Sequence, residues 1–388
     1  MSAEHYDVVI IGAGIHGAGV AQAAAARGHS VLLLERHAPA FGTSSRSSKL
    51  IHGGLRYLES GQLALVRECL RERELLSRLA PELVRLVPFY IPVYRHTTRR
   101  PWQIRSGLSM YALLGGLGEQ VRFAQMPRAQ WNELDGLATH ELQAVYRYFD
   151  AQTDDAALTR AVLHSAQTLG ATVKIPAEFI SATLLPTSCS VRYTHENATH
   201  EITARVLVNA AGPWITDILK KVTPQPFIPN VDLVQGAHLV VDGVTQRGIY
   251  YVEAPQDQRA VFVMPWKNHT LIGTTETLYQ GDPAAVHALP QEIDYLLQTY
   301  HHYFPKAAMA VRESFAGLRV LPRADKNAFS RPRETLLPSD RDMQPRLISI
   351  VGGKLTAYRA TAEKLLKQIS SALPSRRAVA DTRILKLS

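Results

Sequence analysis

The apolar and polar positions near the start of the chain predict a strand, a turn, a helix and a second strand. Residues 6–11 form a β-branched apolar run that is typical of a buried parallel strand. This run meets a glycine turn at 12–14 and then the alanine-rich stretch 18–27, which has high helix propensity. A second apolar run at 29–35 completes a unit that is typical of α/β domains.

The patterns farther along the chain indicate a strand-rich middle and a second α/β unit near the end. Between residues 228 and 275, short apolar runs alternate with turn residues, which favours antiparallel strands. Near the end, an apolar strand is followed by a Gly-Gly turn and a helix that Pro374 closes. The further helices are predicted at 62–79, 159–169, 214–221 and 355–373, and the further strands at 206–210, 238–241, 249–252, 260–264, 270–272 and 347–351.

The predicted fold class is therefore α/β, or α+β overall, with two interleaved domains. A Rossmann-like domain would take residues 1–82, 151–222 and 310–388. An antiparallel-sheet domain would take residues 83–150 and 223–309. The chain has no internal repeat and no low-complexity linker, which favours interleaved over consecutive domains.

Composition and charge limit the classes of protein to which this chain can belong. The 388 residues are 46% hydrophobic, which suits a large core and excludes a disordered or fibrous protein. Cys69 and Cys189 have no partners at metal-ligand or disulfide-framework spacing, so we expect no metal site and a reducing compartment. The sequence has no signal-peptide pattern and no apolar run near the roughly 18 residues of a membrane-spanning helix. The net charge of +9 indicates an anionic partner, which could be nucleic acid, an anionic membrane surface or a phosphorylated substrate.

The first glycine turn carries a dinucleotide-binding motif. Gly12, Gly14 and Gly17 follow a predicted strand and open a predicted helix. Gly12 permits the tight turn, Gly14 lets a pyrophosphate approach the backbone, and Gly17 allows close packing of the helix. Ile15 begins the helix, whose first N–H groups would hold the phosphates. Glu35 ends the second strand, where an acid accepts hydrogen bonds from the adenosine ribose.

This motif alone does not separate NAD from FAD, but two later segments favour FAD. The strand and glycine turn at 206–214 is similar to the second adenine-side contact of FAD-binding oxidoreductases. The strand and turn at 348–356 feed a helix whose positive N-terminal end could face the flavin. The cofactor contacts that we expect in these segments are Ala211, Gly212, Trp214, Gly353, Lys354, Leu355 and Thr356.

The stretch 43–59, with the sequence TSSRSSKLIHGGLRYLE, is much more specific than the glycine motif. It resembles FAD-dependent glycerol-3-phosphate dehydrogenases of the aerobic type, which belong to the D-amino-acid-oxidase-like flavoproteins. The resemblance implies that this loop contributes Thr43, Ser44, Ser45, Ser48, Lys49, Gly53 and Gly54 to a non-covalent FAD site. The similarity covers nearly the whole chain, because it continues through 102–111, 153–155, 209–214, 236–238, 265–266, 272–275, 317–319 and 352–359.

Two features depart from the family pattern. Typical members continue past the point where this chain ends, at Ser388, into a C-terminal helical domain. Glu276 stands where the family has Asp after Gly-Thr-Thr, which is a conservative difference. The first feature affects what we expect of quaternary structure and membrane docking, and neither concerns the residues assigned to chemistry.

The resemblance implies oxidation of sn-glycerol 3-phosphate to dihydroxyacetone phosphate, with hydride transfer to the flavin and electrons passed to quinone. A phosphate dianion is held best by clustered cationic side chains. For this role the family match indicates Arg56, Arg319, Arg331 and Lys354, which lie far apart in the sequence. Lys354 would also stabilise the alkoxide that develops during the reaction.

The proton acceptor has two candidates, His52 and His238. An imidazole with an ordinary pKa near ~6.5 is largely neutral at pH 7 and can accept a proton. His52 is preferred because it lies in the loop that resembles the flavin-contacting segment, whereas His238 begins a strand in the second domain. Tyr57 could pack against the substrate or hydrogen-bond it, and a core tyrosine is an equal alternative.

The run 83–118 contains five arginines and no Asp or Glu. Together with its aromatic and apolar neighbours, this composition favours contact with anionic lipid over contact with nucleic acid, for which no fold signature is present. We therefore expect a cytoplasmic protein at the inner face of the cell membrane, or a simple solvated basic face. The basic and aromatic residues are Arg85, Arg95, Arg99, Arg100, Arg105, Tyr94, Trp102 and Tyr111.

Two other functions fit the same residues. One is an FAD enzyme that oxidises a different 2-hydroxy acid or an amine and passes electrons to oxygen, because an arginine cluster binds carboxylate as well as phosphate. The other is an FAD-binding paralogue without turnover, since a fold does not imply an activity. The presence of His52, Arg319 and Lys354 argues against the second.

Overall fold

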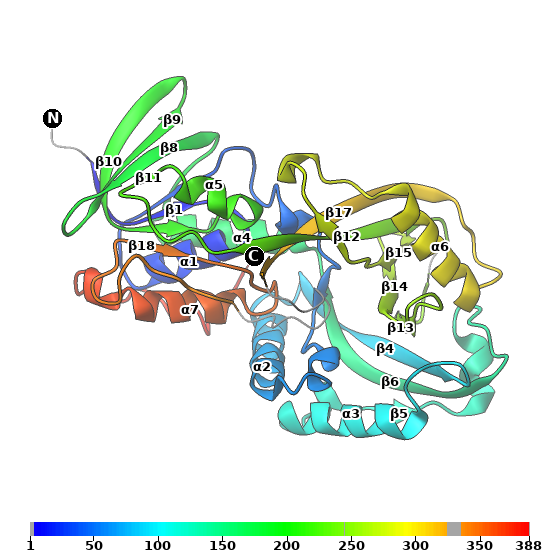
Figure 1. Cartoon of the computed structure of the whole chain (residues 1–388). Helices are drawn as coiled ribbons and strands as arrows, with labels where there is room; N and C mark the ends of the chain where they lie inside the picture. Colours follow the sequence, from blue (N-terminus) through cyan, green and yellow to red (C-terminus); the bar gives the residue numbers. More distant parts are fainter. Residues whose placement is uncertain (1–3, 244, 324–334, 388) are drawn as a thin grey trace.

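An eight-stranded, mainly parallel sheet forms the centre of one half of the molecule (Figure 1). The computed structural model describes residues 4–243, 245–323 and 335–387. The parallel core is buried on both faces, which is why its strands are nearly continuous apolar runs. Its strands are, in order, β10 (Ala198–Asn209), β1 (His5–Ile11), β2 (Val31–Leu34) and β7 (Thr172–Lys174), and β18 (Leu347–Ser349) pairs with the end of β10.

An antiparallel hairpin extends this sheet. Strands β8 (Ala177–Leu184) and β9 (Cys189–His195) pair with each other, and β9 pairs with the first half of β10. A short strand, β11 (Val222–Thr223), runs parallel to β8 at the edge. The hairpin and the short helix α5 (Ile215–Leu219) supply apolar side chains to one face of the parallel core.

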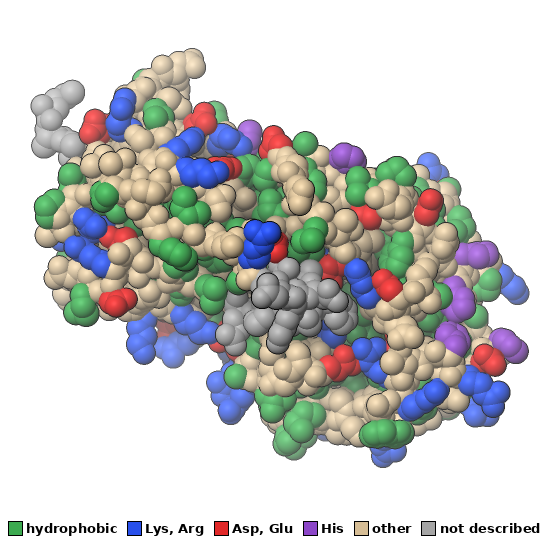
Figure 2. All heavy atoms as spheres, viewed as in Figure 1, with side chains coloured by type: hydrophobic (Ala, Val, Ile, Leu, Met, Phe, Trp, Pro, Cys, Tyr) green, Lys and Arg blue, Asp and Glu red, His purple; other side chains and the backbone are tan. Residues whose placement is uncertain are grey.

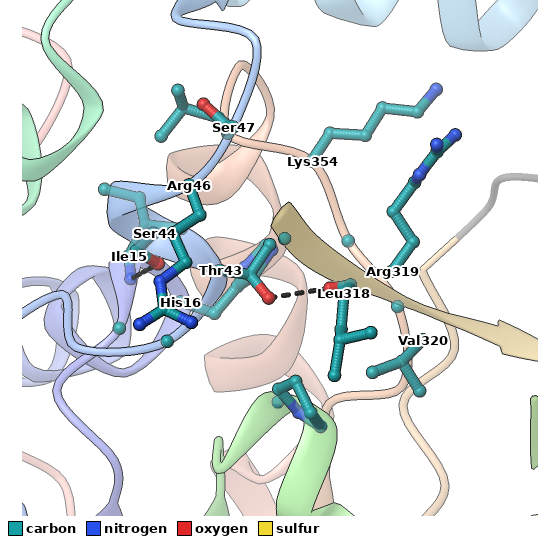
Figure 3. Close-up of a pocket in the computed structure, with 18 of the residues that line it drawn as sticks. Ile15, His16, Thr43, Ser44, Arg46, Ser47, Leu318, Arg319, Val320 and Lys354 are labelled. Atoms are coloured by element: carbon teal, nitrogen blue, oxygen red, sulfur yellow. Dashed lines mark hydrogen bonds between the residues drawn. The ribbon is translucent and has the colours of Figure 1, made fainter. Parts of the chain in front are cut away.

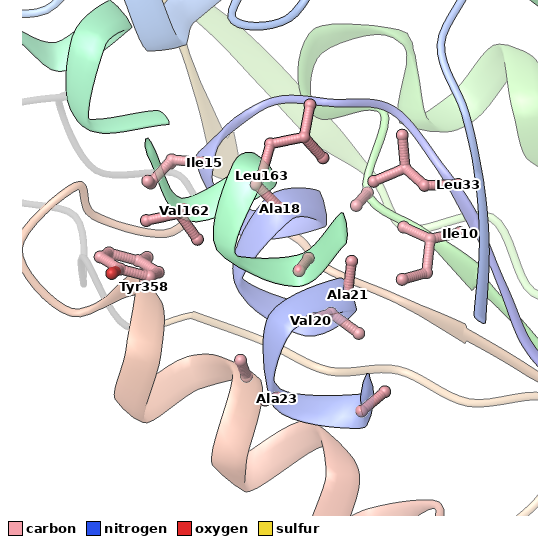
Figure 4. Packing of buried hydrophobic residues seen from close by; sticks show 14 of the residues in the cluster. Ile10, Ile15, Ala18, Val20, Ala21, Ala23, Leu33, Val162, Leu163 and Tyr358 are labelled. Atoms are coloured by element: carbon pink, nitrogen blue, oxygen red, sulfur yellow. The ribbon is translucent and has the colours of Figure 1, made fainter. Parts of the chain in front are cut away.

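Three helices cover the opposite face. Helix α1 (Ile15–Ala26) lies between α4 (Asp155–Thr168) and α7 (Tyr358–Gln368), as Figure 4 shows. Almost all of α1 is buried, and its glycines and alanines let its neighbours come close. A Cβ atom on Gly19 would lie 2.7 Å from the ring of Tyr358. The small residues of α1 therefore set how tightly this layer packs.

A ten-stranded, mainly antiparallel sheet forms the centre of the other half (Figure 1). Two long strands of this sheet, β12 and β17, run side by side over most of their length. The order of strands is β16 (Thr277–Tyr279), β12 (Val231–Val241), β15 (His269–Gly273), β14 (Ala260–Trp266), β13 (Ile249–Glu253), β4 (Val84–Tyr94), β6 (Leu142–Thr153) and β3 (Leu50–Ile51), with β17 (Val311–Pro322) paired to β12 and β5 (Ala124–Gln125) paired to β6.

Helices cover both faces of this second sheet. Helix α6 (Pro290–Tyr303) packs on one face through Leu296 and Tyr300. Helices α2 (Leu63–Leu79) and α3 (Pro101–Leu114) pack on the other face, α3 through Ile104 and Leu108. None of the helices in the described part of the chain has the length and apolar character needed to span a membrane.

The predicted fold class is confirmed, and several element boundaries differ. Strand β10 begins at Ala198 rather than 206, because its first residues are exposed and polar and carry no apolar signal. Helix α4 begins at Asp155, where the Asp154 carboxylate accepts a hydrogen bond from the N–H of Ala157 at 3.0 Å. Helix α7 begins at Tyr358 rather than 355 and ends at Gln368.

Strand β17 lies in the second sheet, although the sequence placed its residues with the first domain. Its partner β12 is far away in the sequence, and strand pairing over such a distance leaves no local pattern. The division of the chain into domains remains a prediction.

Candidate active site

A cavity of about 480 Å³ lies between the two halves of the molecule. Both sheets contribute to its lining, so that segments far apart in the sequence meet there. The predicted site residues that line it are Gly12, Gly14, Ile15, Glu35, Thr43, Ser44, Ser48, His52, Gly54, Arg56, Tyr57, Ala211, Gly212, Trp214, His238, Arg319, Gly353, Lys354, Leu355 and Thr356.

The glycine motif lies at one end of the cavity. Gly12 has φ +104°, and a Cβ atom there would lie 2.8 Å from the carbonyl oxygen of Ala210. Gly17 packs so closely that a Cβ atom would lie 1.9 Å from the carbonyl oxygen of Gly12. The N-cap of α1, Gly14, has no capping side chain, and the first turn has no acidic residue. The positive end of α1 is therefore open to an anion such as a pyrophosphate.

The carboxylate of Glu35 is fixed beside this turn. One of its oxygens accepts a hydrogen bond from the N–H of Ala13 and the other from the N–H of His37, both at 2.8 Å. Trp214 lines the same end, with the guanidinium of Arg36 5.9 Å from the centre of its ring. This arrangement suits a ribose and an adenine ring.

The loop after β2 reaches from the helix start to the second sheet. The Ser44 hydroxyl accepts a hydrogen bond from the N–H of Ile15 at 2.9 Å, and the Thr43 hydroxyl donates one to the carbonyl oxygen of Leu318 at 2.6 Å (Figure 3). Ser44 lies in the short 3-10 turn η1 (Thr43–Ser45). The loop thereby joins the cofactor end of the cavity to strand β17.

Four residues that the sequence assigned to the cofactor do not line the cavity: Gly17, Ser45, Lys49 and Gly53. The Lys49 ammonium is buried and lies 2.6 Å from the carboxylate of Asp155, and it also donates to the carbonyl oxygen of Ser45. These two contacts hold the loop against the start of α4, and the predicted contact of Lys49 with the cofactor stays a prediction. Gly17 acts through packing, as described above.

The turn at Gly352 and Gly353 closes the cavity against the start of α1. Both glycines have positive φ, +79° and +112°, and a Cβ atom on Gly353 would lie 2.0 Å from Nε2 of His16. Nδ1 of His16 is buried without a hydrogen-bond partner among the described residues. Burial lowers the pKa of His16 to about 4, so its ring is neutral at pH 7.

Sequence reasoning missed His16, although it lies inside the glycine motif. The His16 side chain faces the cavity next to the turns at Gly12 and Gly353, where a Cβ atom would come too close to neighbouring atoms. An open helix N-terminus, a fixed ribose acid and a buried, unpartnered ring nitrogen together fit a dinucleotide cofactor.

Cationic side chains gather at the other end of the cavity. Lys354 and Arg319 point the same way (Figure 3). The Lys354 ammonium lies 3.7 Å from the centre of the Tyr57 ring, and Arg319 donates to the carbonyl oxygen of Thr275 at 2.9 Å. Arg56 lines the same cavity. Arg331, the fourth predicted phosphate ligand, lies outside the described residues.

Glu276 forms an ion pair with Arg319. Its carboxylate lies 3.3 Å from Nη1 of Arg319, and the carboxylate is almost fully buried. Arg259 also donates to the backbone carbonyl of Glu276. The acidic residue that departs from the family pattern therefore contacts a predicted phosphate ligand directly.

His52 is supported by a buried network that the sequence did not indicate. The N–H of Gly53 donates to the Tyr111 hydroxyl at 2.8 Å, and that hydroxyl donates to the carboxylate of Asp150 at 2.6 Å. Asp150 also forms a buried ion pair with Arg73 at 2.7 Å. No local pattern identifies this set, because its members come from four separate segments.

The pKa of His52 is lowered, and burial is the largest cause. The charge of Asp150 acts in the opposite direction, and Lys354 and Arg56 lower the pKa further. The His52 ring is therefore neutral at pH 7 and able to accept a proton.

His238 lies in a more restricted environment. Its Nε2 is 2.9 Å from the Ser48 hydroxyl, and its ring stacks on Phe315 with centroids 5.0 Å apart. Burial, with the charges of Lys49 and Arg319, lowers its pKa to about 3. His238 is therefore a very weak base, and its environment does not favour the role of proton acceptor.

Comparison with known proteins agrees with this site. The chain belongs to the FAD dependent oxidoreductase family, whose model matches residues 7–359, and its cofactor is FAD. A glycerol-3-phosphate dehydrogenase of Pseudomonas aeruginosa is 39% identical over 378 residues, which cover 95% of this chain and 72% of the relative. A D-erythritol 1-phosphate dehydrogenase of Brucella abortus is 35% identical over 382 residues, covering 96% and 75%.

A solved structure extends the comparison to the whole described fold. The glycerol-3-phosphate dehydrogenase from Bacillus halodurans, complexed with FAD, matches with a TM-score of 0.74 and 28% identity. The match covers 100% of this chain and 68% of that chain. The present protein is thus an FAD-dependent oxidoreductase that is similar to enzymes of polyol phosphates.

Proposed function

We propose that this enzyme oxidises sn-glycerol 3-phosphate to dihydroxyacetone phosphate and passes the electrons to a quinone. The observation that carries this proposal is that Arg56, Arg319, Lys354 and His52 line one cavity, where the charges of Lys354 and Arg56 lie close enough to His52 to lower its pKa. The names of two relatives support it, because both act on phosphorylated polyols.

The cationic side chains bind the phosphate group of the substrate. A guanidinium fork matches a phosphate dianion with two parallel hydrogen bonds, and Arg319 and Arg56 both line the cavity. Glu276 and Thr275 limit the directions that Arg319 can take. Binding of the phosphate to these side chains would hold the rest of the substrate in the cavity that His52 also lines.

FAD, when bound, supplies the acceptor for the hydride that leaves the middle carbon. The hydroxyl proton of the same carbon moves to a ring nitrogen of His52, which is neutral at pH 7 because its pKa is lowered. The C–H and O–H bonds break and a C=O bond forms, so the alcohol loses two electrons and two hydrogens. The Lys354 ammonium stabilises negative charge on the oxygen while the proton leaves.

The test is anaerobic bleaching of the bound flavin by a panel of substrates. We expect bleaching by glycerol 3-phosphate, none by glycerol, and none by glycine or lactate. A protein that responds only to erythritol 1-phosphate would contradict the glycerol 3-phosphate assignment and keep the polyol-phosphate class. Bleaching by an amine or a simple 2-hydroxy acid, or by no compound, would contradict the class itself.

We also propose that the enzyme contacts the membrane through α3 and the residues around it. Trp102, Leu113 and Leu117 are 68%, 59% and 66% exposed on this surface. The exposed arginines Arg95 and Arg105 lie close to them in the sequence, and Figure 2 shows hydrophobic and basic side chains side by side along the lower edge of the molecule, where α3 lies. The sequence also placed Arg99, Tyr94 and Tyr111 in this basic surface, which is wrong for all three. Arg99 is paired with two carboxylates, and the two tyrosine side chains are buried.

Each basic residue near an anionic surface contributes about 1 kcal/mol, so binding should be reversible and weaken with salt. We expect a variant with Arg95, Arg100 and Arg105 changed to Ala to sediment less with anionic liposomes at low salt. Its flavin content should match that of the unmodified protein. Equal sedimentation of the two proteins would contradict docking through this surface.

A further inference from the structure

Arg99 joins three segments at the substrate end of the molecule. It lies in the loop between β4 and α3, and its Nε and Nη2 contact the two carboxylate oxygens of Glu59, the latter at 2.9 Å. Its Nη1 contacts the carboxylate of Glu253. The Arg99 side chain is 22% exposed, whereas the neighbouring residues Arg95 and Arg100 are exposed. The Arg99 guanidinium therefore contacts two carboxylates through its three nitrogens.

Glu59 ends the turn that carries two proposed substrate contacts. The 3-10 turn η2 (Leu55–Leu58) contains Arg56 and Tyr57, and the N–H of Glu59 donates to the carbonyl oxygen of Arg56 at 3.2 Å. The turn begins at Gly54, which has φ +75°, and a Cβ atom there would lie 2.2 Å from the Tyr57 ring. The turn is thus entered through a glycine and fixed at its other end by Glu59.

Glu253 belongs to a rigid part of the second sheet. It ends strand β13, and its backbone carbonyl accepts a hydrogen bond from the Tyr303 hydroxyl at 2.6 Å. Its carboxylate also accepts one from the N–H of Thr98 at 2.8 Å. Arg99 therefore ties the substrate turn to a fixed point of the sheet.

The positive charge of Arg99 also affects the electrostatics of the cavity. Tyr251 lines the cavity, and the charges of Arg99, Arg56, Glu59 and Glu253 all act on its pKa, so these groups share one neighbourhood. Without Arg99, two carboxylates would remain there without their shared cation. Two such charges would repel an anionic substrate.

We propose that Arg99 is a positioning residue for the phosphate end of the substrate site. It fixes turn η2 so that Arg56 and Tyr57 face the cavity, and it neutralises Glu59 and Glu253 beside the anion. This inference rests on the proposed function, because it requires a substrate that carries a phosphate.

The test compares Arg99→Ala with Arg100→Ala, assayed in detergent with a soluble electron acceptor. Arg100 is a matched control, because it is the adjacent arginine and its side chain donates a hydrogen bond to the backbone carbonyl of Arg95 rather than to a carboxylate. For Arg99→Ala we expect the KM for glycerol 3-phosphate to rise roughly tenfold, with a smaller change in kcat. Arg99→Lys should recover part of the loss, and Arg100→Ala should stay within about twofold of the unmodified enzyme.

A second variant, Glu59→Gln, distinguishes the effect of Arg99 on the position of turn η2 from its effect on the local charge. Glu59→Gln removes one negative charge, which by itself would favour anion binding, but it also weakens the tie to turn η2. A raised KM in Glu59→Gln supports positioning, and an unchanged or lowered KM overturns it. Inhibition by inorganic phosphate should weaken in parallel with KM, while flavin content and the flavin spectrum stay unchanged.

The outcomes distinguish this inference from the proposed function. If the unmodified enzyme neither oxidises glycerol 3-phosphate nor binds inorganic phosphate, the proposed function fails. If it does both and Arg99→Ala behaves as Arg100→Ala does, the role of Arg99 alone is overturned.

Discussion

The two ends of the cavity are built in different ways. The cofactor end is built mainly from backbone groups: a helix N-terminus, closely packed glycines, and two N–H groups that hold the Glu35 carboxylate. The substrate end depends on charged side chains, several of which are held by a second side chain, as Arg319 is by Glu276. The first end is therefore sensitive to added atoms, and the second to lost charges.

The largest expected effect is at the backbone end. Gly17→Ala places a Cβ atom 1.9 Å from the carbonyl oxygen of Gly12, so the helix start must move away from the first strand. We expect the purified variant to lose most of its flavin, measured as the ratio of flavin to protein absorbance. The matched control is Gly107→Ala in α3, where a Cβ atom meets nothing within 4 Å. Full flavin retention in Gly17→Ala would contradict the dependence on close packing.

The next effect is at the charged end. Arg319→Ala should lower kcat/KM for glycerol 3-phosphate by about 100- to 1000-fold, because it removes a proposed phosphate ligand and one of the two guanidinium groups that pair with Glu276. Flavin content should not change. Arg312→Ala is the control on the same strand, where the arginine is 63% exposed and pairs with Asp242 outside the cavity. Similar losses in both variants would remove the distinction between the two arginines.

The pH dependence of kcat/KM is a further test of the substrate end, through His52. Because the pKa of His52 is lowered from 6.5, its ring stays neutral at and below pH 7, and protonation removes the proton acceptor only in more acidic solution. We expect kcat/KM to be level from pH 8 to 7 and to fall in more acidic solution, with the midpoint of the acid limb below 6.5. A midpoint of the acid limb above pH 7 would exclude a desolvated imidazole as the base.

The smallest expected effect concerns the charged residue of the backbone end. Glu35→Ala removes the predicted ribose contact and the acceptor for the N–H groups of Ala13 and His37. We expect the dissociation constant of FAD to rise roughly tenfold, since the other contacts remain. Reconstitution of the apoprotein, followed by flavin fluorescence, measures it. A loss as large as that of Gly17→Ala would show that side chains matter as much as backbone at this end.

The same contrast explains what could be predicted from the sequence. The cofactor end was recognisable because Gly12, Gly14 and Gly17 occupy one short segment with fixed spacing. The substrate end was identified only through a family resemblance, because Arg56, Arg319 and Lys354 meet by folding alone.

Residues that act through partners were missed or misplaced. Asp150 and Arg73 gave no signal, because a buried ion pair between distant segments has no spacing rule, and Tyr111 was assigned to a basic, aromatic surface although its side chain is buried. Arg99 was assigned to a basic surface, since its acidic partners are remote in the sequence. The sequence also did not reveal that the Lys49 ammonium pairs with the buried carboxylate of Asp155.

The pairing of β10 with both β1 and β18 has a consequence for biosynthesis. The strand from the start of the chain and the strand from near its end flank the same partner, and the turn at Gly352 and Gly353 completes the cavity. Ribosomes add about 5–20 residues per second, so tens of seconds separate synthesis of the glycine motif from synthesis of that turn. We therefore expect nascent chains to acquire FAD late, after most of the polypeptide has emerged from the ribosome.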